Sequence, residues 1–284
     1  MTENKLPLEK NRDFGELFND TFLFIKYNFK NLLMGMIYFV VPFALLQGIA
    51  LGIVQHQALT SLSLGQVPSA FGASTINNLL ITYLFLFITY TFTIAFIFQY
   101  MKLYKVSTDK VIELKNVWKL MLGVTPKIFL SIISMAILSG IGFIFLIIPG
   151  IYLMVCFSLV LPIIIFQEDS LGGAISSCFS LIKNNWWKTF GFLIILGLIA
   201  SALSFVFQLP ALIYQLITTI HVAQNETSQV TESLSILFSI IQAIGTSLLQ
   251  LLPFTGIGIL YFSLVEQKEN PALLKELESV GANE

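Results

Sequence analysis

The sequence predicts an all-α polytopic membrane protein: a bundle of six transmembrane helices with three amphipathic helices at the membrane surface. Two observations lead to this fold class. Apolar residues make up 56% of the 284 positions and charged residues 11%, whereas soluble proteins are about one quarter charged. In addition, the fifteen Lys and Arg residues occupy only alternate gaps between long apolar runs.

Six apolar runs meet or approach the length needed to cross a bilayer, whose hydrocarbon core of about 30 Å requires about 20 helical residues. They are 32–54, 79–101, 128–148, 150–166, 189–216 and 234–265. The fourth run is the shortest, and the turn Pro149-Gly150 joins it to the third. We expect both to cross the membrane. The alternative is a bent or re-entrant hairpin, which would leave every other loop on the same side.

The positions of the basic residues predict the orientation of the chain. Cytoplasmic loops retain Lys and Arg, whereas short translocated loops lack them. The gaps at roughly 55–78, 147–150 and 217–233 contain neither residue type. We therefore expect both termini in the cytoplasm and the chain in the inner (plasma) membrane of a cell. It would form a single membrane domain over 1–284, with a cytoplasmic amphipathic segment at 1–31, the bundle at 32–265 and a cytoplasmic tail at 266–284.

The segments before the first, third and fifth runs share one pattern, an amphipathic helix ending in a Lys-aromatic junction. Phe14 to Lys30 and Val111 to Lys127 are each sixteen positions, and Leu171 to Lys188 is seventeen. This spacing predicts a threefold internal repeat of a surface helix followed by a transmembrane hairpin. In the first segment the expected apolar stripe is Phe14, Leu17, Phe18, Phe22, Ile25 and Phe29, and the expected polar face is Asp13, Glu16, Asn19, Asp20, Lys26 and Lys30. In the third segment the stripe is Leu171, Ala174, Ile175, Cys178, Ile182 and Trp186, opposite Ser176, Ser180, Lys183 and Asn184.

The third segment also contains the residues that we consider as an interface with a protein partner or with lipid. Trp side chains favour the membrane–water boundary, and Lys side chains extend from it toward water. Two acids precede this segment and would complement the N-terminal dipole of its helix. Alternatively, they contact a partner or the lysines that follow. The candidate interface residues are Glu168, Asp169, Lys183, Trp186, Trp187 and Lys188.

Chemically reactive groups are scarce inside the expected spans. No Asp, Glu, Lys, Arg or His lies near the middle of a run, and such residues usually mark proton relays or ion paths in membranes. We therefore predict no catalytic, cofactor-binding or metal-binding residues. Glutamines within the runs are expected to form hydrogen bonds between helices, or alternatively to line a polar path. The net charge of −1 argues against a nucleic-acid partner.

One stretch resembles a known group of membrane proteins. Residues 149–190 read PGIYLMVCFSLVLPIIIFQEDSLGGAISSCFSLIKNNWWKTF. The stretch is similar to the YciC-like membrane proteins and to the membrane domain attached to some glycerophosphoryl diester phosphodiesterases. The matching positions are Pro149, Gly150, Pro162, Glu168, Ala174, Cys178, Leu181, Trp186 and Trp187. Cys178 stands where the pattern usually has Ser. The resemblance implies an integral inner-membrane protein. The phosphodiesterase domain has no counterpart here, so its activity is not carried over.

These observations predict a non-enzymatic accessory or scaffold protein of the bacterial inner membrane. The expected partners are membrane lipids and a protein bound at the cytoplasmic face. One alternative is a transporter or channel for lipid or another amphiphile, suggested by the hairpin repeat and by prolines near the runs. The other is a membrane enzyme that works at the cytoplasmic interface around Glu168 and Asp169.

Overall fold

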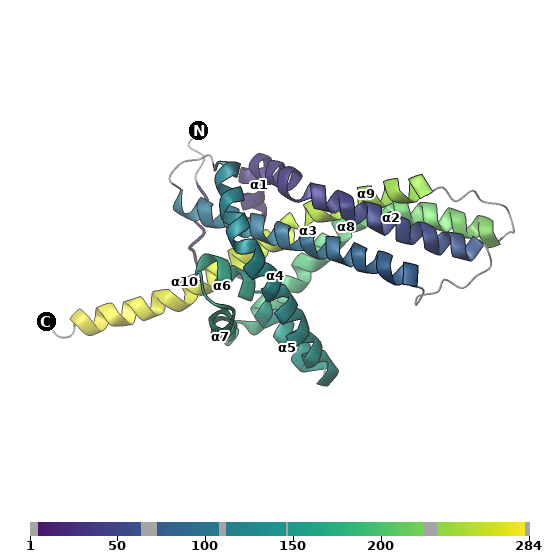
Figure 1. Ribbon diagram of the computed structural model, residues 1–284. Helices are drawn as coiled ribbons and strands as arrows, with labels where there is room; N and C mark the ends of the chain where they lie inside the picture. The colour runs from purple at the N-terminus through teal and green to yellow at the C-terminus, as the bar shows by residue number, and fades with distance from the viewer. Residues whose placement is uncertain (1–4, 64–72, 108–111, 146, 224–231, 282–284) are drawn as a thin grey trace. The chain divides into compact units, whose positions relative to one another are not determined.

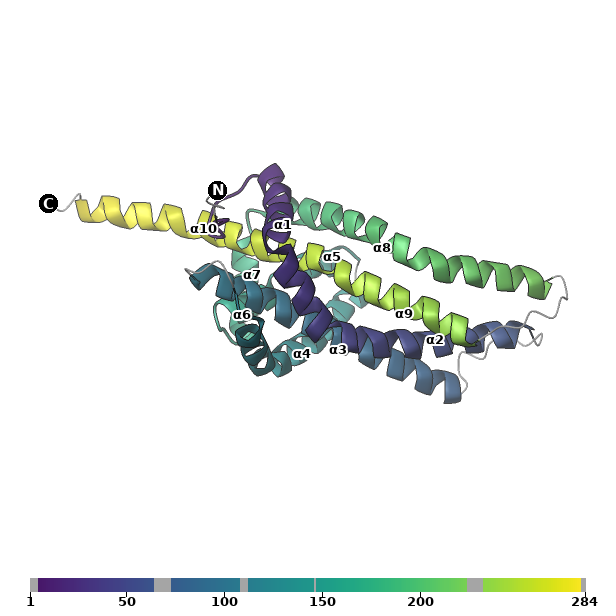
Figure 2. The ribbon, with the colours of Figure 1, turned by 90° about the horizontal axis from the view of Figure 1, so that it is seen from above.

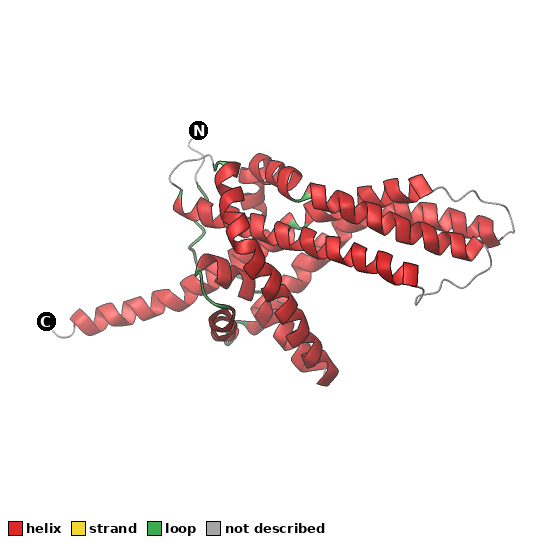
Figure 3. Ribbon diagram, in the orientation of Figure 1, coloured by secondary structure: helices red, strands yellow, loops and turns green. Residues whose placement is uncertain are grey.

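The computed structural model describes residues 5–63, 73–107, 112–145, 147–223 and 232–281. Within these residues every regular element is a helix (Figure 3), so the expected all-α fold is confirmed. The elements in chain order (Figure 1) are α1 (Phe14–Phe39), α2 (Val41–Ser63), α3 (Ala73–Val106), α4 (Leu114–Phe145), α5 (Ile147–Phe157), α6 (Val160–Phe166), α7 (Leu171–Ile182), α8 (Trp186–Ala223), α9 (Glu232–Leu249) and α10 (Leu251–Gly281).

The apolar runs form helical segments that are long enough to cross a membrane. Five such segments are Thr75–Val106, Leu114–Gly142, Ile147–Phe166, Trp186–Ile220 and Glu232–Glu269. The remaining run, 32–54, is divided between α1 and α2, which meet at a bend of 53°. The described residues therefore hold five such helices, or six if this bent pair is one span. The chain is therefore a multi-pass membrane protein. Two of the gaps without basic residues fall partly outside the described residues, at 64–72 and 224–231.

Prolines lie at the start of four helices. Pro42, Pro149, Pro162 and Pro253 occupy the second or third position of α2, α5, α6 and α10. Proline lacks a backbone N–H and is tolerated in the first turn of a helix, where no partner for that group is needed. The chain can therefore change direction just before each of them. Pro126 and Pro210 instead lie inside the continuous helices α4 and α8.

The hydroxyl groups of four threonines in α3 are satisfied by the helix itself. The side chains of Thr82, Thr89, Thr91 and Thr93 each donate a hydrogen bond to the carbonyl four residues earlier, at 2.7–2.8 Å. Lipid cannot accept these bonds, so a hydroxyl in a spanning helix requires a partner within the protein. This back-bonding allows a helix rich in threonine to lie in an apolar environment.

The chain forms two compact units, each assembled from separate segments. The first comprises Met1–Leu32, Ile94–Leu198 and Leu251–Glu284, and the second comprises Leu33–Thr93 and Ile199–Gln250. The helices α1, α3 and α8 each contribute residues to both units.

In the second unit, α2 and α9 lie side by side (Figures 1 and 2). Two glycines of α2 make this approach possible. A Cβ atom on Gly48 would lie 2.6 Å from the Cα of Ile240, and one on Gly52 would lie 2.5 Å from the Cα of Ile236. Close backbone approach of this kind is typical of membrane helix pairs with small residues at their interface. Nearby, the Ser239 hydroxyl donates a hydrogen bond of 2.9 Å to Gln55.

The core of the first unit is formed by the last part of α3, by α6 and by the first part of α10. Every residue from Ile94 to Met101 is buried, as expected for a helix enclosed on all sides. The ring of Phe98 lies 5.6 Å from that of Phe166 and 6.2 Å from that of Phe254. These contacts join α3, α6 and α10 into one apolar centre.

The three amphipathic segments differ in how they join their spans. The first two continue without interruption into α1 and α4, whereas the third forms the separate helix α7. The burial pattern expected for the third segment is confirmed: Ala174, Cys178 and Ile182 are buried, and Ser180 and Lys183 are exposed. The threefold repeat itself stays a prediction.

The first segment has two apolar faces rather than one. Leu17, Phe24 and Leu32 are fully buried, whereas Phe22 and Phe29 of the expected stripe are 46% and 54% exposed. The exposed rings are available to lipid, while the buried ones belong to the core of the first unit.

The packing of α2 against α9 gives a testable prediction. Gly52→Ala places a methyl group against the backbone of α9, which neither helix can relieve by rotating a side chain. Overpacking costs about 1–3 kcal/mol, so we expect a lower midpoint of thermal unfolding in mild detergent. The matched control is Gly123→Ala in α4, where no atom lies within 4 Å of the added methyl group. Equal midpoints for the two variants would contradict the close packing.

Candidate functional site

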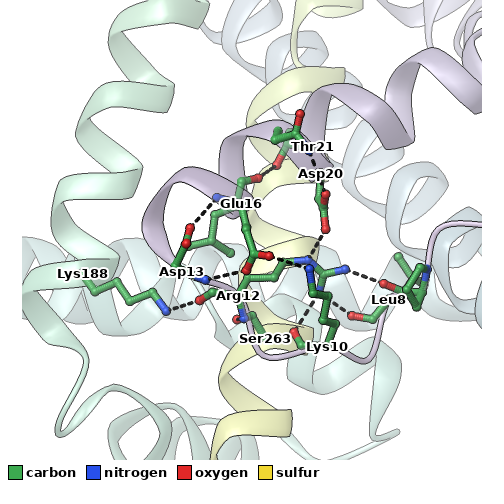
Figure 4. Close-up of polar contacts among 12 residues, drawn as sticks. Leu8, Lys10, Arg12, Asp13, Glu16, Asp20, Thr21, Lys188 and Ser263 are labelled. Carbon is green, nitrogen blue, oxygen red and sulfur yellow. Dashed lines mark hydrogen bonds and ion pairs between the residues drawn. The ribbon is translucent and has the colours of Figure 1, made fainter.

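The segment that precedes α1 is folded around the side chain of Arg12 (Figure 4). This side chain is completely buried, and its Nε donates a 2.7 Å hydrogen bond to the Asp20 carboxylate, which is 9% exposed. Its Nη1 donates to the carbonyls of Leu8 at 2.7 Å and Lys10 at 3.0 Å, and Nη2 donates to that of Pro7. A guanidinium has five N–H donors in a fixed plane, so one side chain binds three backbone carbonyls of this segment at once.

The backbone of Arg12 joins this segment to two distant helices (Figure 4). Its N–H donates a 3.0 Å hydrogen bond to the Ser263 hydroxyl of α10, and its carbonyl accepts a 2.6 Å hydrogen bond from Lys188 of α8. Asp13 and Glu16 bond reciprocally to each other's backbone N–H at the start of α1, as in a capping box.

Asp20 was expected on the outward polar face of the first amphipathic segment, and that expectation was wrong. The carboxylate turns inward because the buried guanidinium of Arg12 requires a counter-charge. Arg12 is the chain's only arginine. That choice among many lysines is the one sequence signal that could have indicated a buried ion pair, because Arg is preferred for such pairs.

Several lysines bond to the backbone where helices of the first unit end. Lys102 of α3 donates to the Ile165 carbonyl near the end of α6 at 2.8 Å. Lys127 of α4 donates to the Asp169 carbonyl between α6 and α7. Lys5 donates to the Lys105 carbonyl at the end of α3 at 3.3 Å. The last carbonyls of a helix have no partner within it, so Lys102 and Lys5 satisfy carbonyls at the ends of α6 and α3. Lys127 instead fixes the connection that precedes α7.

The two acids of the candidate interface lie at the start of α7. Glu168 has a positive φ of 58° and forms a 2.7 Å ion pair with Lys102. This hydrogen-bonded ion pair lowers the pKa of the Glu168 carboxyl below its ordinary value. Asp169 accepts a 2.7 Å bond from the N–H of Ser170, and Ser170 caps α7 by accepting from Gly173. The acids therefore hold the connection between α6 and α7, as the helix-dipole interpretation anticipated in part.

The aromatic members of the candidate interface lie at the other end of α7, around a groove of about 540 Å³ that we call the aromatic groove. The ring of Trp186 stacks on that of Tyr152 at 5.9 Å and on that of Phe190 at 4.9 Å. Trp187 is 77% exposed. The residues that line the aromatic groove are Ile148, Ile151, Tyr152, Lys183, Asn184, Trp186, Trp187 and Phe190.

The structure thus divides the six candidate residues among three places. Lys183, Trp186 and Trp187 line the aromatic groove, Glu168 and Asp169 close the turn before α7, and Lys188 binds the Arg12 carbonyl. The contributions of Tyr152 and Ile148 were not predicted from the sequence. Nothing in the periodicity of α5 indicates that it contacts the start of α8.

The chemistry of the aromatic groove suits an amphiphile. Its walls are aromatic and aliphatic, and Lys183 is the only charged residue among those that line it. Tyr and Trp rings combine an apolar body with a polar tip, which fits an environment that is apolar at one end and wet at the other.

No protein-family model matches the chain, and no curated protein or solved structure matches it. The resemblance of residues 149–190 to the YciC-like membrane proteins therefore stays a prediction.

The buried ion pair gives a second testable prediction. Arg12→Met leaves the Asp20 carboxylate buried without its counter-charge, which costs about 3–5 kcal/mol. We expect a large loss in the free energy of unfolding measured with denaturant in detergent micelles. Replacing both partners, Arg12→Met with Asp20→Leu, is expected to recover part of that loss.

The control is the exposed ion pair of the same segment. Lys10 and Glu16 lie 2.6 Å apart with side chains 44% and 40% exposed, and pairs of this kind contribute about 1 kcal/mol or less. Equal losses in the free energy of unfolding for Lys10→Met and Arg12→Met would show that the buried pair contributes no more to stability than the exposed pair.

Proposed function

We propose that the chain is a multi-pass accessory or scaffold protein of a bacterial inner membrane, with both termini in the cytoplasm. The orientation is supported by the basic residues, all of which lie in the gaps expected on the cytoplasmic side. The scaffold role is supported above all by the way these residues are used. Lys102, Lys127 and Lys188 each bond to a backbone carbonyl of another segment of the first unit.

Such cross-links make the helix ends of the first unit a fixed surface. A lysine that only sets orientation would extend into water, where its ammonium is fully hydrated. Here the ammonium groups connect α3 to α6, α4 to the turn before α7, and α8 to the segment before α1. A surface with fixed geometry loses little conformational freedom on binding, and this suits a protein that positions a partner.

A transporter or channel for an amphiphile is the second candidate, and the aromatic groove is the observation that favours it. The groove presents exposed apolar surface, including Ile148 at 80% exposure and Trp187 at 77%. Under this function, the groove would be a transient binding site for the transported amphiphile rather than part of a surface that binds a protein partner.

Native mass spectrometry of the protein gently extracted from its own membrane tests the proposal. The accessory function predicts a second protein subunit at a fixed ratio to this chain. It further predicts that the subunit is lost from Arg12→Met, which loosens the fixed surface, but retained by Lys10→Met. A stoichiometric lipid or amphiphile without any protein subunit would contradict the accessory function and support the transporter.

A further inference from the structure

The aromatic groove brings together two parts of the first unit that the charge pattern places on opposite sides of the membrane. Ile148 lies in the first turn of α5, together with the Pro149-Gly150 pair that was expected to form the turn between the two runs. It falls in the gap at 147–150 expected outside. Lys183 belongs to the gap between α7 and α8 expected in the cytoplasm. Both line the same groove, so one of the two assignments requires revision.

Ring contacts place the first turn of α5 close to the start of α8. Tyr152 follows Pro149 by three residues, a rise of about 4.5 Å along the helix axis. Its ring lies 5.9 Å from that of Trp186 and 6.2 Å from that of Phe179 in α7. A full crossing would separate the turn from the start of α8 by the hydrocarbon thickness of about 30 Å. The stacked rings leave no room for that separation.

Independent contacts keep the start of α8 on the side of the N-terminal segment. Lys188, two residues after Trp186, donates its 2.6 Å hydrogen bond to the carbonyl of Arg12. The basic residues of both segments predict the cytoplasmic side. It is therefore the turn at 147–150 that changes sides.

We propose that α4 and α5 do not cross the membrane but form a hairpin along the boundary that contains Lys183, and that its tip completes the aromatic groove as a site for an anionic phospholipid. Two of the six apolar runs then stay on one side of the membrane, and four cross it. The proposal depends on membrane insertion and not on the accessory function.

The surroundings of the aromatic groove determine its occupant. A tip that lies at the level of Trp186 and Lys183 is at the membrane–water boundary, where lipid headgroups are located. Lys183 supplies a positive charge that no carboxylate in the groove lining offsets. Ile148, Ile151 and Phe190 supply an apolar surface for an acyl chain. A phospholipid with a net negative headgroup matches both features at once.

The topology is tested by thiol accessibility. Ile148→Cys is made in a chain whose own cysteines, both buried, are replaced by Ala. Lys183→Cys and Gln66→Cys mark the expected inner and outer sides. Treated with a membrane-impermeant maleimide in vesicles of each orientation, Ile148→Cys is expected to react from the same side as Lys183→Cys. Reaction from the side of Gln66→Cys would show that the runs cross the membrane and would overturn the hairpin.

If Ile148→Cys reacts with the maleimide from neither side, cross-linking within the membrane decides between the two topologies. Tyr152→Cys and Trp186→Cys are combined and treated with a short, membrane-permeant bifunctional maleimide. Mass spectrometry of the digested protein is expected to find the two peptides linked. Absence of the link would overturn the hairpin, because a crossing helix holds these positions far apart.

The lipid site is tested by quenching of tryptophan fluorescence with brominated lipids. Trp118→Phe leaves Trp186 and Trp187 as the only tryptophans of the chain, and both are excited selectively at the red edge of the absorption band. At equal mole fractions, brominated phosphatidylglycerol is expected to quench more strongly than brominated phosphatidylcholine. One lysine near a membrane surface contributes about 1 kcal/mol toward anionic lipid, which corresponds to a relative affinity about five-fold higher.

Lys183→Gln is expected to abolish this preference, and the matched control Lys119→Gln, an exposed lysine of α4 that does not line the groove, is expected to retain it. Equal quenching by both lipids, or a preference unchanged in Lys183→Gln, would overturn the anionic-lipid assignment. Quenching by neither lipid would overturn it too, by showing that a protein surface covers the groove. The accessory function is unaffected by these outcomes, since its own test is the presence of a protein subunit.

Discussion

The polar groups at the ends of apolar helices need partners, and this constraint organises the first unit. A carbonyl or a charge that is buried within the protein loses its contact with water and needs a partner from the chain itself. The chain meets the requirement with its own basic side chains: the Arg12 guanidinium takes up carbonyls of the segment before α1, and Lys102 and Lys127 take up those around α6 and α7. These basic residues, whose positions determine the orientation of the chain in the membrane, therefore also hold the helices together.

The helices themselves could be predicted from the sequence because each reflects a local property. Lengths of apolar runs predicted the long helices, and Pro42, Pro162 and Pro253 marked where helices break. The amphipathic stripe of α7 was also predictable, since its two faces meet distinct environments: Cys178 faces the protein and Ser180 is exposed. Burial raises the pKa of the Cys178 thiol to about 12, in keeping with its expected role as an apolar packing residue.

The sites could not be predicted, because apolar periodicity does not distinguish lipid from protein. Both are apolar environments, so the sequence of α1 contains no mark that Leu17 and Phe24 face the core while Phe22 and Phe29 are exposed. The contact between Tyr152 and Trp186 could not be predicted either, because it depends on how α5 packs against α7 and α8. For a related reason the burial of Asp20 could not be predicted, because its charge favours water unless a buried partner such as Arg12 is present.

The contacts of Arg12 also impose an order on biosynthesis. Its ion pair with Asp20 spans eight residues and can form early, but its backbone contacts reach across 176 residues to Lys188 and 251 residues to Ser263. Chains are made from the N-terminus, and contacts so distant in sequence form only after the intervening helices exist. The segment that contains Arg12 is therefore made before the helices that it contacts, and its contacts with α8 and α10 are among the last to form.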